Sequence, residues 1–158
     1  MKILLAIDDS LGSEAATRAV IDQFSSQNTE VRVLHAIASP SSFVKFVVAA
    51  SEQVAGTPID LGPELEAASR KAETLVAKVA DQLRLQGFKV TSAVERGDPK
   101  SVIIDTVARW DADLIVIGAH GADALERFLI GSVSDAVARH APCSVQIVRQ
   151  AEGAGPRG

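Results

Sequence analysis

The chain has 158 residues, of which 47% are hydrophobic and 23% are charged, and its net charge is −4. These values are typical of a soluble globular protein with one domain, and they lack the basic excess of proteins that bind nucleic acid or anionic membranes. A single cysteine, Cys143, excludes an internal disulfide and suits a reducing compartment. The apolar run at the N-terminus is shorter than that of a signal peptide, and no stretch approaches the ~20 apolar residues of a membrane span. We therefore expect a cytoplasmic location.

The first elements alternate between strand and helix. The continuous apolar run Lys2–Ile7 predicts a strand that is buried on both faces. Apolar residues at helical spacing over Ser13–Phe24 predict an amphipathic helix, with Ser10 or Ser13 as its cap. The β-branched residues of Glu30–Ile37 predict a second strand.

The segment Ala38–Leu61 has no clear periodicity and is interpreted as a variable loop or insertion. Within it lies the apolar stretch FVKFVVAA, residues Phe43–Ala50. This stretch could be a lid over a ligand, a partner surface or a helix that faces the core, and we favour the helix.

The second half of the chain repeats the alternation more clearly. A long amphipathic helix is predicted between Pro63 and Gly87, since proline favours helix starts and glycine favours helix ends. The elements expected after it are a strand at Phe88–Glu95, a helix at Lys100–Trp110, a strand at Leu114–Gly118, a helix at Ser132–Ala141 and a strand at Cys143–Val148. We assign one domain to residues 1–149 and a disordered tail to residues 150–158.

Alternating buried strands and helices predict the fold class α/β: one domain with an open, doubly wound, five-stranded parallel sheet and helices on both faces. In such sheets, ligands bind beyond the carboxyl ends of the strands, where the strand order reverses. This rule places Asp8, Ser10, Ala36 and the segment Gly118–Ser134 at one edge of the sheet.

The segment after the fourth strand has the pattern Gly118-x2-Gly121-x9-Gly131-Ser132. It is neither a P-loop, because no lysine follows the glycines, nor a dinucleotide fingerprint. Gly118 would let the backbone approach a ligand or adopt a positive φ, and Gly121 could form an anion nest. Gly131 opens a helix whose N–H groups, with the Ser132 and Ser134 hydroxyls, could bind phosphate without a lysine.

Several of these residues also have a purely structural interpretation. The glycines could be turn and cap residues, and Asp8 or Asp9 could be a helix-capping carboxylate. We favour phosphate binding for the glycine pattern, a ligand role for Asp8 and a structural role for Asp9. For His120 we expect the backbone N–H to matter more than the ring, and we assign no catalytic residue. Cys143 is expected to be buried and inert, and the histidines and cysteine lack a metal-ligand spacing, so no metal site is assigned.

The glycine pattern resembles the nucleotide-binding motif of the universal stress protein family. The resemblance covers most of the chain: ILLAIDDSLGSEAATRAV, VRVLHAI, ERGDPKSVIIDTVARWDADLIVIGAHG and IGSVSDAVARHAPCSVQIV each resemble segments of that family, in order. It implies a homodimer formed through the last strand, Ser144–Val148, and membership in the branch that binds ATP. By position it implies adenine and ribose contacts from Ala6, Ile7, Asp8 and Ala36. It implies phosphate contacts from Gly118, Ala119, His120, Gly121, Gly131, Ser132, Val133 and Ser134.

The expected function is that of a regulatory, stress-response protein that binds ATP or AMP, with or without Mg²⁺, and signals through its dimer and an unidentified protein partner. Two alternatives stay open at this point. One is a dimeric interaction scaffold that binds no nucleotide, and the other is a slow ATPase. Neither nucleic acid nor a membrane is expected as a partner.

Overall fold

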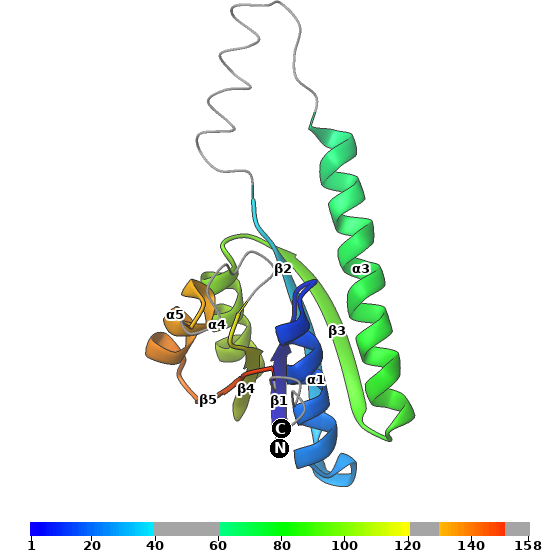
Figure 1. The fold of residues 1–158 in the computed structure, drawn as a ribbon, viewed down its shortest axis with the longest axis vertical. Coiled ribbons are helices and arrows are strands. Elements are labelled where there is room, and N and C mark those ends of the chain that lie inside the picture. The colour runs from blue at the N-terminus through cyan, green and yellow to red at the C-terminus, as the bar shows by residue number, and fades with distance from the viewer. Residues whose placement is uncertain (40–60, 121–129, 151–158) are drawn as a thin grey trace, which may run out of the picture.

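A computed structural model of the chain describes residues 1–39, 61–120 and 130–150. Most of the predicted segment 38–61 and nearly all of the predicted tail therefore lie outside the described residues. Five parallel strands form one sheet with the order β3-β2-β1-β4-β5 (Figure 1). The strands are β1 (Lys2–Ala6), β2 (Glu30–Ile37), β3 (Lys89–Arg96), β4 (Leu114–Gly118) and β5 (Ser144–Val148).

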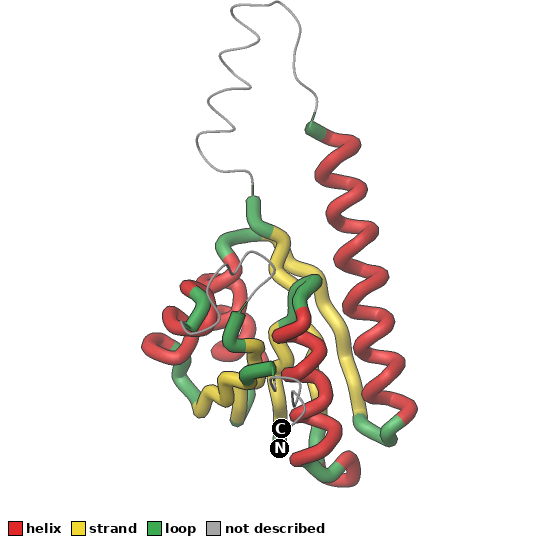
Figure 2. The backbone as a smooth tube through the Cα atoms, viewed as in Figure 1, coloured by secondary structure: helices red, strands yellow, loops and turns green. Residues whose placement is uncertain are grey.

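The helices lie on both faces of the sheet, so the predicted doubly wound α/β fold is confirmed (Figure 2). They are α1 (Leu11–Gln23), α3 (Gly62–Leu85), α4 (Pro99–Trp110) and α5 (Ser132–His140), with a short 3-10 turn at Ser26–Asn28 that the sequence did not predict. Predicted boundaries are wrong by one residue at several strands: Ile7, Phe88 and Cys143 lie just outside β1, β3 and β5.

Two buried clusters explain why the central strands are apolar throughout. Along β1, Ile3 and Leu5 face α1 and α3, while Leu4 and Ala6 face α4 and α5. Because successive side chains of a strand point to opposite faces, a strand covered on both sides needs apolar residues at every position. The side chains of Ile3, Leu4 and Leu5 are fully buried.

Local signals fix the helix ends. Ser10 is the cap of α1, and its hydroxyl accepts a hydrogen bond from the Ser13 N–H at 3.2 Å, which decides between the two predicted caps. Asp98 caps α4 in the same way through the Ser101 N–H. Gly87 follows α3 with a φ of 88°, as expected of a glycine at a helix end. Among the described helices, none is long and apolar enough to cross a membrane.

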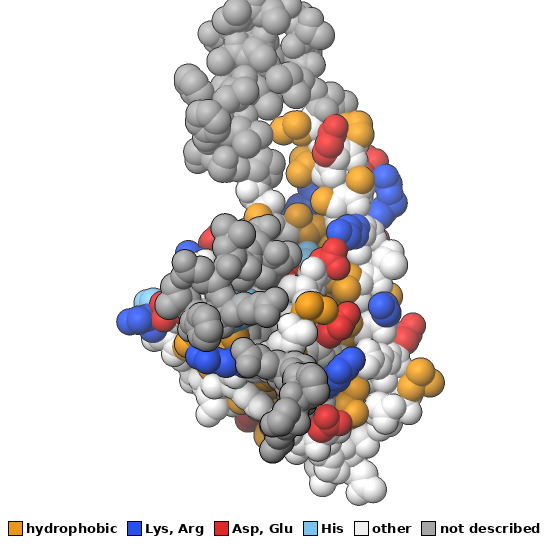
Figure 3. Space-filling view, viewed as in Figure 1, with side chains coloured by type: hydrophobic (Ala, Val, Ile, Leu, Met, Phe, Trp, Pro, Cys, Tyr) orange, Lys and Arg blue, Asp and Glu red, His pale blue; other side chains and the backbone are white. Residues whose placement is uncertain are grey.

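The order of the strands reverses at β1, which pairs with β2 on one side and β4 on the other. The carboxyl ends of these three strands therefore meet where a ligand of an open α/β sheet is expected. In the space-filling view, acidic and basic side chains are interspersed over the visible surface, without a patch of one sign (Figure 3).

Candidate functional site

A cavity of about 530 Å³ lies at the carboxyl ends of β1, β2 and β4. This volume is within the usual range for small-molecule sites, roughly 300–1,000 Å³. Its described lining residues are Ala6, Ile7, Asp8, Asp9, Ser13, Leu34, His35, Ala36, Pro99, Ile103, Ile117, Gly118, His120, Gly131, Ser132, Val133 and Ser134. Its lining combines apolar side chains from β1, β2, β4 and α4 with the first residues of α5.

The cavity brings together all but two of the residues that were predicted to bind a ligand. Gly121 lies outside the described residues. Ala119 is buried and absent from the lining, and its N–H donates to the Val148 carbonyl at 2.8 Å. In this structure that N–H is therefore committed to β5, which differs from the predicted phosphate contact.

Other lining residues were missed by sequence reasoning. Ser13 and Asp9 are neighbours of Asp8 and could have been found from it, and His35 precedes Ala36. Pro99 and Ile103 come from the start of α4, for which no ligand motif gave a signal.

The turn between β1 and α1 is closed by its own hydrogen bonds. The Asp8 N–H donates to the Ser13 hydroxyl oxygen at 2.7 Å, and that hydroxyl donates back to Asp8 Oδ1 at 2.7 Å. The Ser10 hydroxyl also donates to Asp8 Oδ1. Asp8 thus orders the start of α1 while it lines the cavity, so its structural and ligand-facing interpretations are compatible.

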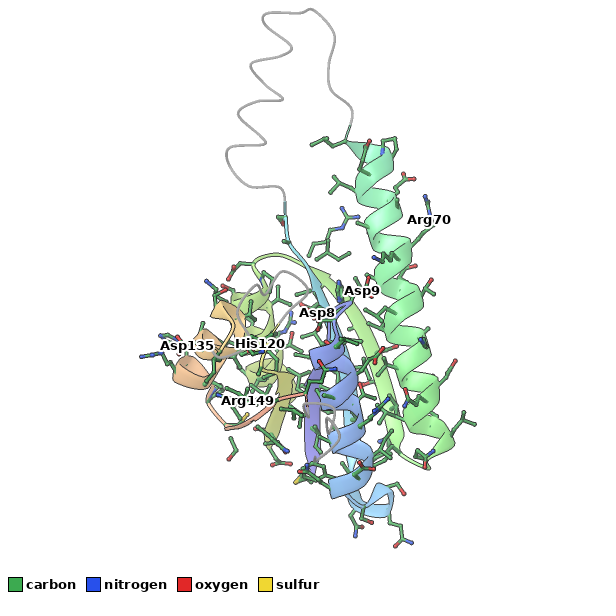
Figure 4. All side chains as sticks on the ribbon, in the orientation of Figure 1. Asp8, Asp9, Arg70, His120, Asp135 and Arg149 are labelled. Atoms are coloured by element: carbon green, nitrogen blue, oxygen red, sulfur yellow. The ribbon has the colours of Figure 1, made fainter. Side chains whose placement is uncertain are left out.

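Asp9 points from the same turn toward α3 (Figure 4). Its carboxylate forms an ion pair with Lys71 at 2.6 Å between Oδ2 and Nζ. The hydrogen bond and the positive charge of Lys71 lower the pKa of Asp9. The ion pair connects the rim of the cavity to α3. The charge of Lys71 compensates the negative charge of one of the two carboxylates that line the cavity.

Gly118 is a glycine for a reason that the sequence did not predict. It is not one of the described glycines with a positive φ. A methyl group at Gly118 would instead lie 2.6 Å from the carbonyl carbon of Gly12, in the first turn of α1. Close packing between two backbones, and not a strained conformation, therefore requires glycine at the end of β4.

The first residues of α5 line the cavity and carry N–H groups without helical acceptors. Gly131 is the cap residue, and its N–H donates to the Ala119 carbonyl at 2.7 Å. The N–H groups of Ser132, Val133 and Ser134 belong to the first turn, where no helical acceptor exists, and all three residues line the cavity. This geometry, together with the helix dipole, favours an anion.

The Ser134 hydroxyl has a different role from the predicted one. It is buried and donates to the Gly118 carbonyl at 2.7 Å, so it is committed to the protein and is not a spare donor for phosphate. The bond joins the first turn of α5 to the end of β4.

The ring of His120 also departs from the prediction, which emphasised its backbone. Its Nε2 atom is buried and has no hydrogen-bond partner in the described part of the structure, and the residue lines the cavity. Buried polar atoms without partners are rare in folded proteins. His35, in contrast, is satisfied as expected, with Nδ1 at 2.9 Å from the Ile7 carbonyl oxygen.

The described lining contains two carboxylates and no lysine or arginine. Positive potential at the α5 end comes, within the described lining, from backbone dipoles and N–H groups. Among the described residues, no three His, Cys, Asp or Glu side chains are grouped to hold a metal ion. The site as described can accept an apolar ring system at one end and an anionic group at the other.

Cys143 differs from the expected buried thiol. It is partly exposed, just before β5. Partial burial and the negative charge of Asp113 raise the pKa of the thiol.

Comparison with known proteins adds sequence evidence. Residues 1–149 match a family model described as the Universal stress protein family. A protein of Staphylococcus saprophyticus, named as a universal stress protein, is 34% identical over 154 residues, which cover 95% of this chain and 84% of that protein. A similarly named protein of Staphylococcus epidermidis is 50% identical over 64 residues. These residues make up 40% of this chain, and the match spans about two fifths (39%) of that relative's length.

Solved structures share the fold. UspA from Lactobacillus plantarum superposes with a TM-score of 0.74 at 22% identity, over 94% of this chain and 97% of that one. A family member from Arabidopsis thaliana with AMP bound has a TM-score of 0.66 at 18% identity, over 99% and 96% of the two chains. A universal stress protein in complex with cAMP has a TM-score of 0.62 at 20% identity, over 94% and 96%.

Proposed function

Because this chain belongs to the universal stress protein family, we propose that it binds an adenine nucleotide, ATP or AMP, in the cavity at the carboxyl ends of β1, β2 and β4. The observation that carries this proposal is the α5 end of the cavity. This end is lined by residues whose first-turn N–H groups lack a helical acceptor and by His120, whose buried Nε2 has no partner among the described residues.

The opposite end of the cavity suits a purine nucleoside. Ala6, Leu34, Ala36 and Ile103 give it an apolar lining, and Asp8 supplies a carboxylate beside it. Two structural neighbours were crystallised with AMP or cAMP, which supports the same ligand class. ATP would bring Mg²⁺ with it, and that ion would reduce the repulsion between the phosphates and the carboxylates of the rim.

Calorimetric titration of nucleotide-free protein tests this function, with ATP and MgCl₂ in one series and AMP in another. We expect saturable binding with about one site per chain. The absence of heat with ATP and with AMP, together with no competition by either nucleotide at millimolar concentration, would contradict the proposal and favour the dimeric scaffold.

We also propose that the protein is cytoplasmic and that it signals as a homodimer formed through β5. The two edges of the sheet support the choice of β5 as the dimer strand. The β3 edge carries Lys89, Glu95 and Arg96, and the Arg84 guanidinium donates to the Val90 carbonyl at 3.2 Å. The β5 edge, SVQIV, has no charged residue. Charged residues protect an edge from pairing, whereas an uncharged edge favours it. A monomer by light scattering at micromolar concentration would contradict this assignment.

A further inference from the structure

The start of α1 touches the end of β4 mainly through the backbone of Gly12, and the Ser10 hydroxyl also donates to the His120 carbonyl at 3.4 Å. A methyl group at Gly12 would lie 2.5 Å from the carbonyl oxygen of His120 and 3.5 Å from Gly118 Cα. The contact is reciprocal, because a methyl group at Gly118 would lie 2.6–2.9 Å from backbone atoms of Gly12. Neither glycine can take a side chain here unless one backbone moves away from the other.

The backbone of residues 118–120 is held from its other side by hydrogen bonds. The Ser134 hydroxyl donates to the Gly118 carbonyl and the Gly131 N–H donates to the Ala119 carbonyl, both at 2.7 Å. The Ala119 N–H donates to the Val148 carbonyl at 2.8 Å. The segment is thus fixed to α5 and β5, while on the α1 side it meets the long Ser10–His120 hydrogen bond and the close approach of Gly12.

Gly12 connects residues that border the two halves of the cavity. On its own element, the Ser10 and Ser13 hydroxyls donate to Asp8 Oδ1, so hydrogen bonds join the start of α1 to the Asp8 carboxylate. Across the contact, Gly118 and His120 line the cavity beside the first turn of α5. The Gly12 contact therefore sets the distance between the Asp8 turn and the donors of α5.

We propose that Gly12 is a positioning residue of the nucleotide site, which sets this distance so that one ligand can reach Asp8 and the α5 donors together. The proposal rests on the nucleotide-binding function above. It specifies the ligand class: a nucleoside 5′-phosphate spans both halves, whereas a nucleoside occupies the Asp8 half. Gly12 thus favours phosphorylated ligands without touching the phosphate.

The test compares Gly12→Ala with the wild-type protein for binding of ATP and of adenosine. Because displaced binding groups lose much of their effect, we expect the affinity for ATP to fall on the order of tenfold. The affinity for adenosine should fall by less than about threefold, since adenosine depends on one half. Alanine is a better helix former than glycine, so α1 itself should not be weakened by the substitution.

A control and a ligand-free readout separate this proposal from the proposed function. Leu11→Ala changes the neighbouring residue of the same turn, whose side chain is 59% exposed, and should alter neither affinity. In ¹H–¹⁵N spectra without ligand, Gly12→Ala should shift the amide resonances of Ala119 and His120, whereas Leu11→Ala should not. If Gly12→Ala does not fold, Ser134→Ala releases the same backbone from the α5 side and should give the same selective loss of ATP affinity.

The outcomes are distinct. Shifted amide resonances of Ala119 and His120 in Gly12→Ala, with a selective loss of ATP affinity, support the proposal. Unshifted resonances, unchanged ATP affinity, or equal losses for ATP and adenosine would overturn it. If wild-type protein binds no nucleotide, the proposed function fails and the role of Gly12 in ligand selection fails with it, while shifted resonances would still establish the backbone contact.

Discussion

The two halves of the cavity differ in how completely the protein satisfies its own polar groups. In the β1–α1 turn, the Asp8 N–H and Asp8 Oδ1 are both engaged by hydroxyls of the same turn. At the start of α5, residues whose first-turn N–H groups lack a helical acceptor line the cavity, and His120 Nε2 is buried without a partner among the described residues. The first half stabilises the fold, and the second half is the part that a ligand would complete.

The largest effect is expected from removing one donor of the α5 half. Ser132 is the first residue of the helix, a position that tolerates proline because its N–H has no helical partner. Ser132→Pro should therefore keep the fold but weaken ATP binding by about 10- to 100-fold, as expected for a lost hydrogen bond to a charged group. Calorimetry measures the affinity, and thermal unfolding checks the fold.

Ser132→Ala is the matched control, because it removes the hydroxyl and keeps the N–H. It should bind ATP more tightly than Ser132→Pro. Equal losses in both variants would show that the hydroxyl, and not the backbone donor, binds the ligand.

The second prediction concerns the β1–α1 turn, whose polar groups form hydrogen bonds with one another. Ser13→Ala removes both hydrogen bonds that the buried Ser13 hydroxyl makes with Asp8. We expect the free energy of unfolding to fall by about 1–3 kcal/mol, measured in urea. Ser25→Ala, at an exposed serine without a capping hydrogen bond, should change it little. A Ser13→Ala variant as stable as wild type would contradict the structural role of the turn.

The third prediction uses His120 Nε2, which has no hydrogen-bond partner in the described part of the chain. His120→Leu replaces a ring whose buried Nε2 has no partner among the described residues by an apolar side chain, so the free energy of unfolding should be unchanged or higher. ATP affinity should fall by about three- to tenfold, because a donor to the phosphates is lost. A lower free energy of unfolding with unchanged ATP affinity would show that the His120 ring stabilises the fold and does not bind the ligand. The two halves of the cavity would then not differ in the way proposed.

The smallest effect is expected at the rim of the cavity. Lys71→Met should raise the pKa of Asp9 toward its ordinary value, because the hydrogen bond and charge of Lys71 lower it. A lowered pKa stabilises the folded state above the unfolded pKa, and that contribution is lost as the pH falls through the folded pKa. Wild type should therefore lose this stabilisation only below about pH 4. An NMR titration of the Asp9 carboxyl measures the shift, and Arg70→Met, on the outward side of α3, should not change it (Figure 4).

The sequence predicted the order of elements and most of the cavity lining because both depend on local signals. Apolar periodicity identifies strands and helices, and the parallel-sheet rule then brings Asp8, Ala36 and Gly131 to one edge. Element boundaries were predicted less accurately, since Ile7 continues the apolar run of β1 without belonging to the strand.

What the sequence could not predict depends on contacts between distant segments. The Gly12–Gly118 packing joins α1 to β4, and nothing near either glycine signals the other. The commitment of the Ser134 hydroxyl to Gly118 and the burial of His120 Nε2 likewise follow from how α5 docks on the sheet. A residue type can suggest phosphate binding, but only the assembled fold shows which of its donors are already in use.

The most direct test is a titration of ¹⁵N-labelled, nucleotide-free protein with ATP and MgCl₂, followed by NMR. We predict saturable shifts of the Ser132, Val133 and Ser134 amides and of the His120 ring, with smaller changes at Ser10 and Ser13. Saturable shifts elsewhere, or no shifts at the start of α5 at millimolar ATP, would contradict the claim that a nucleotide completes this half of the cavity.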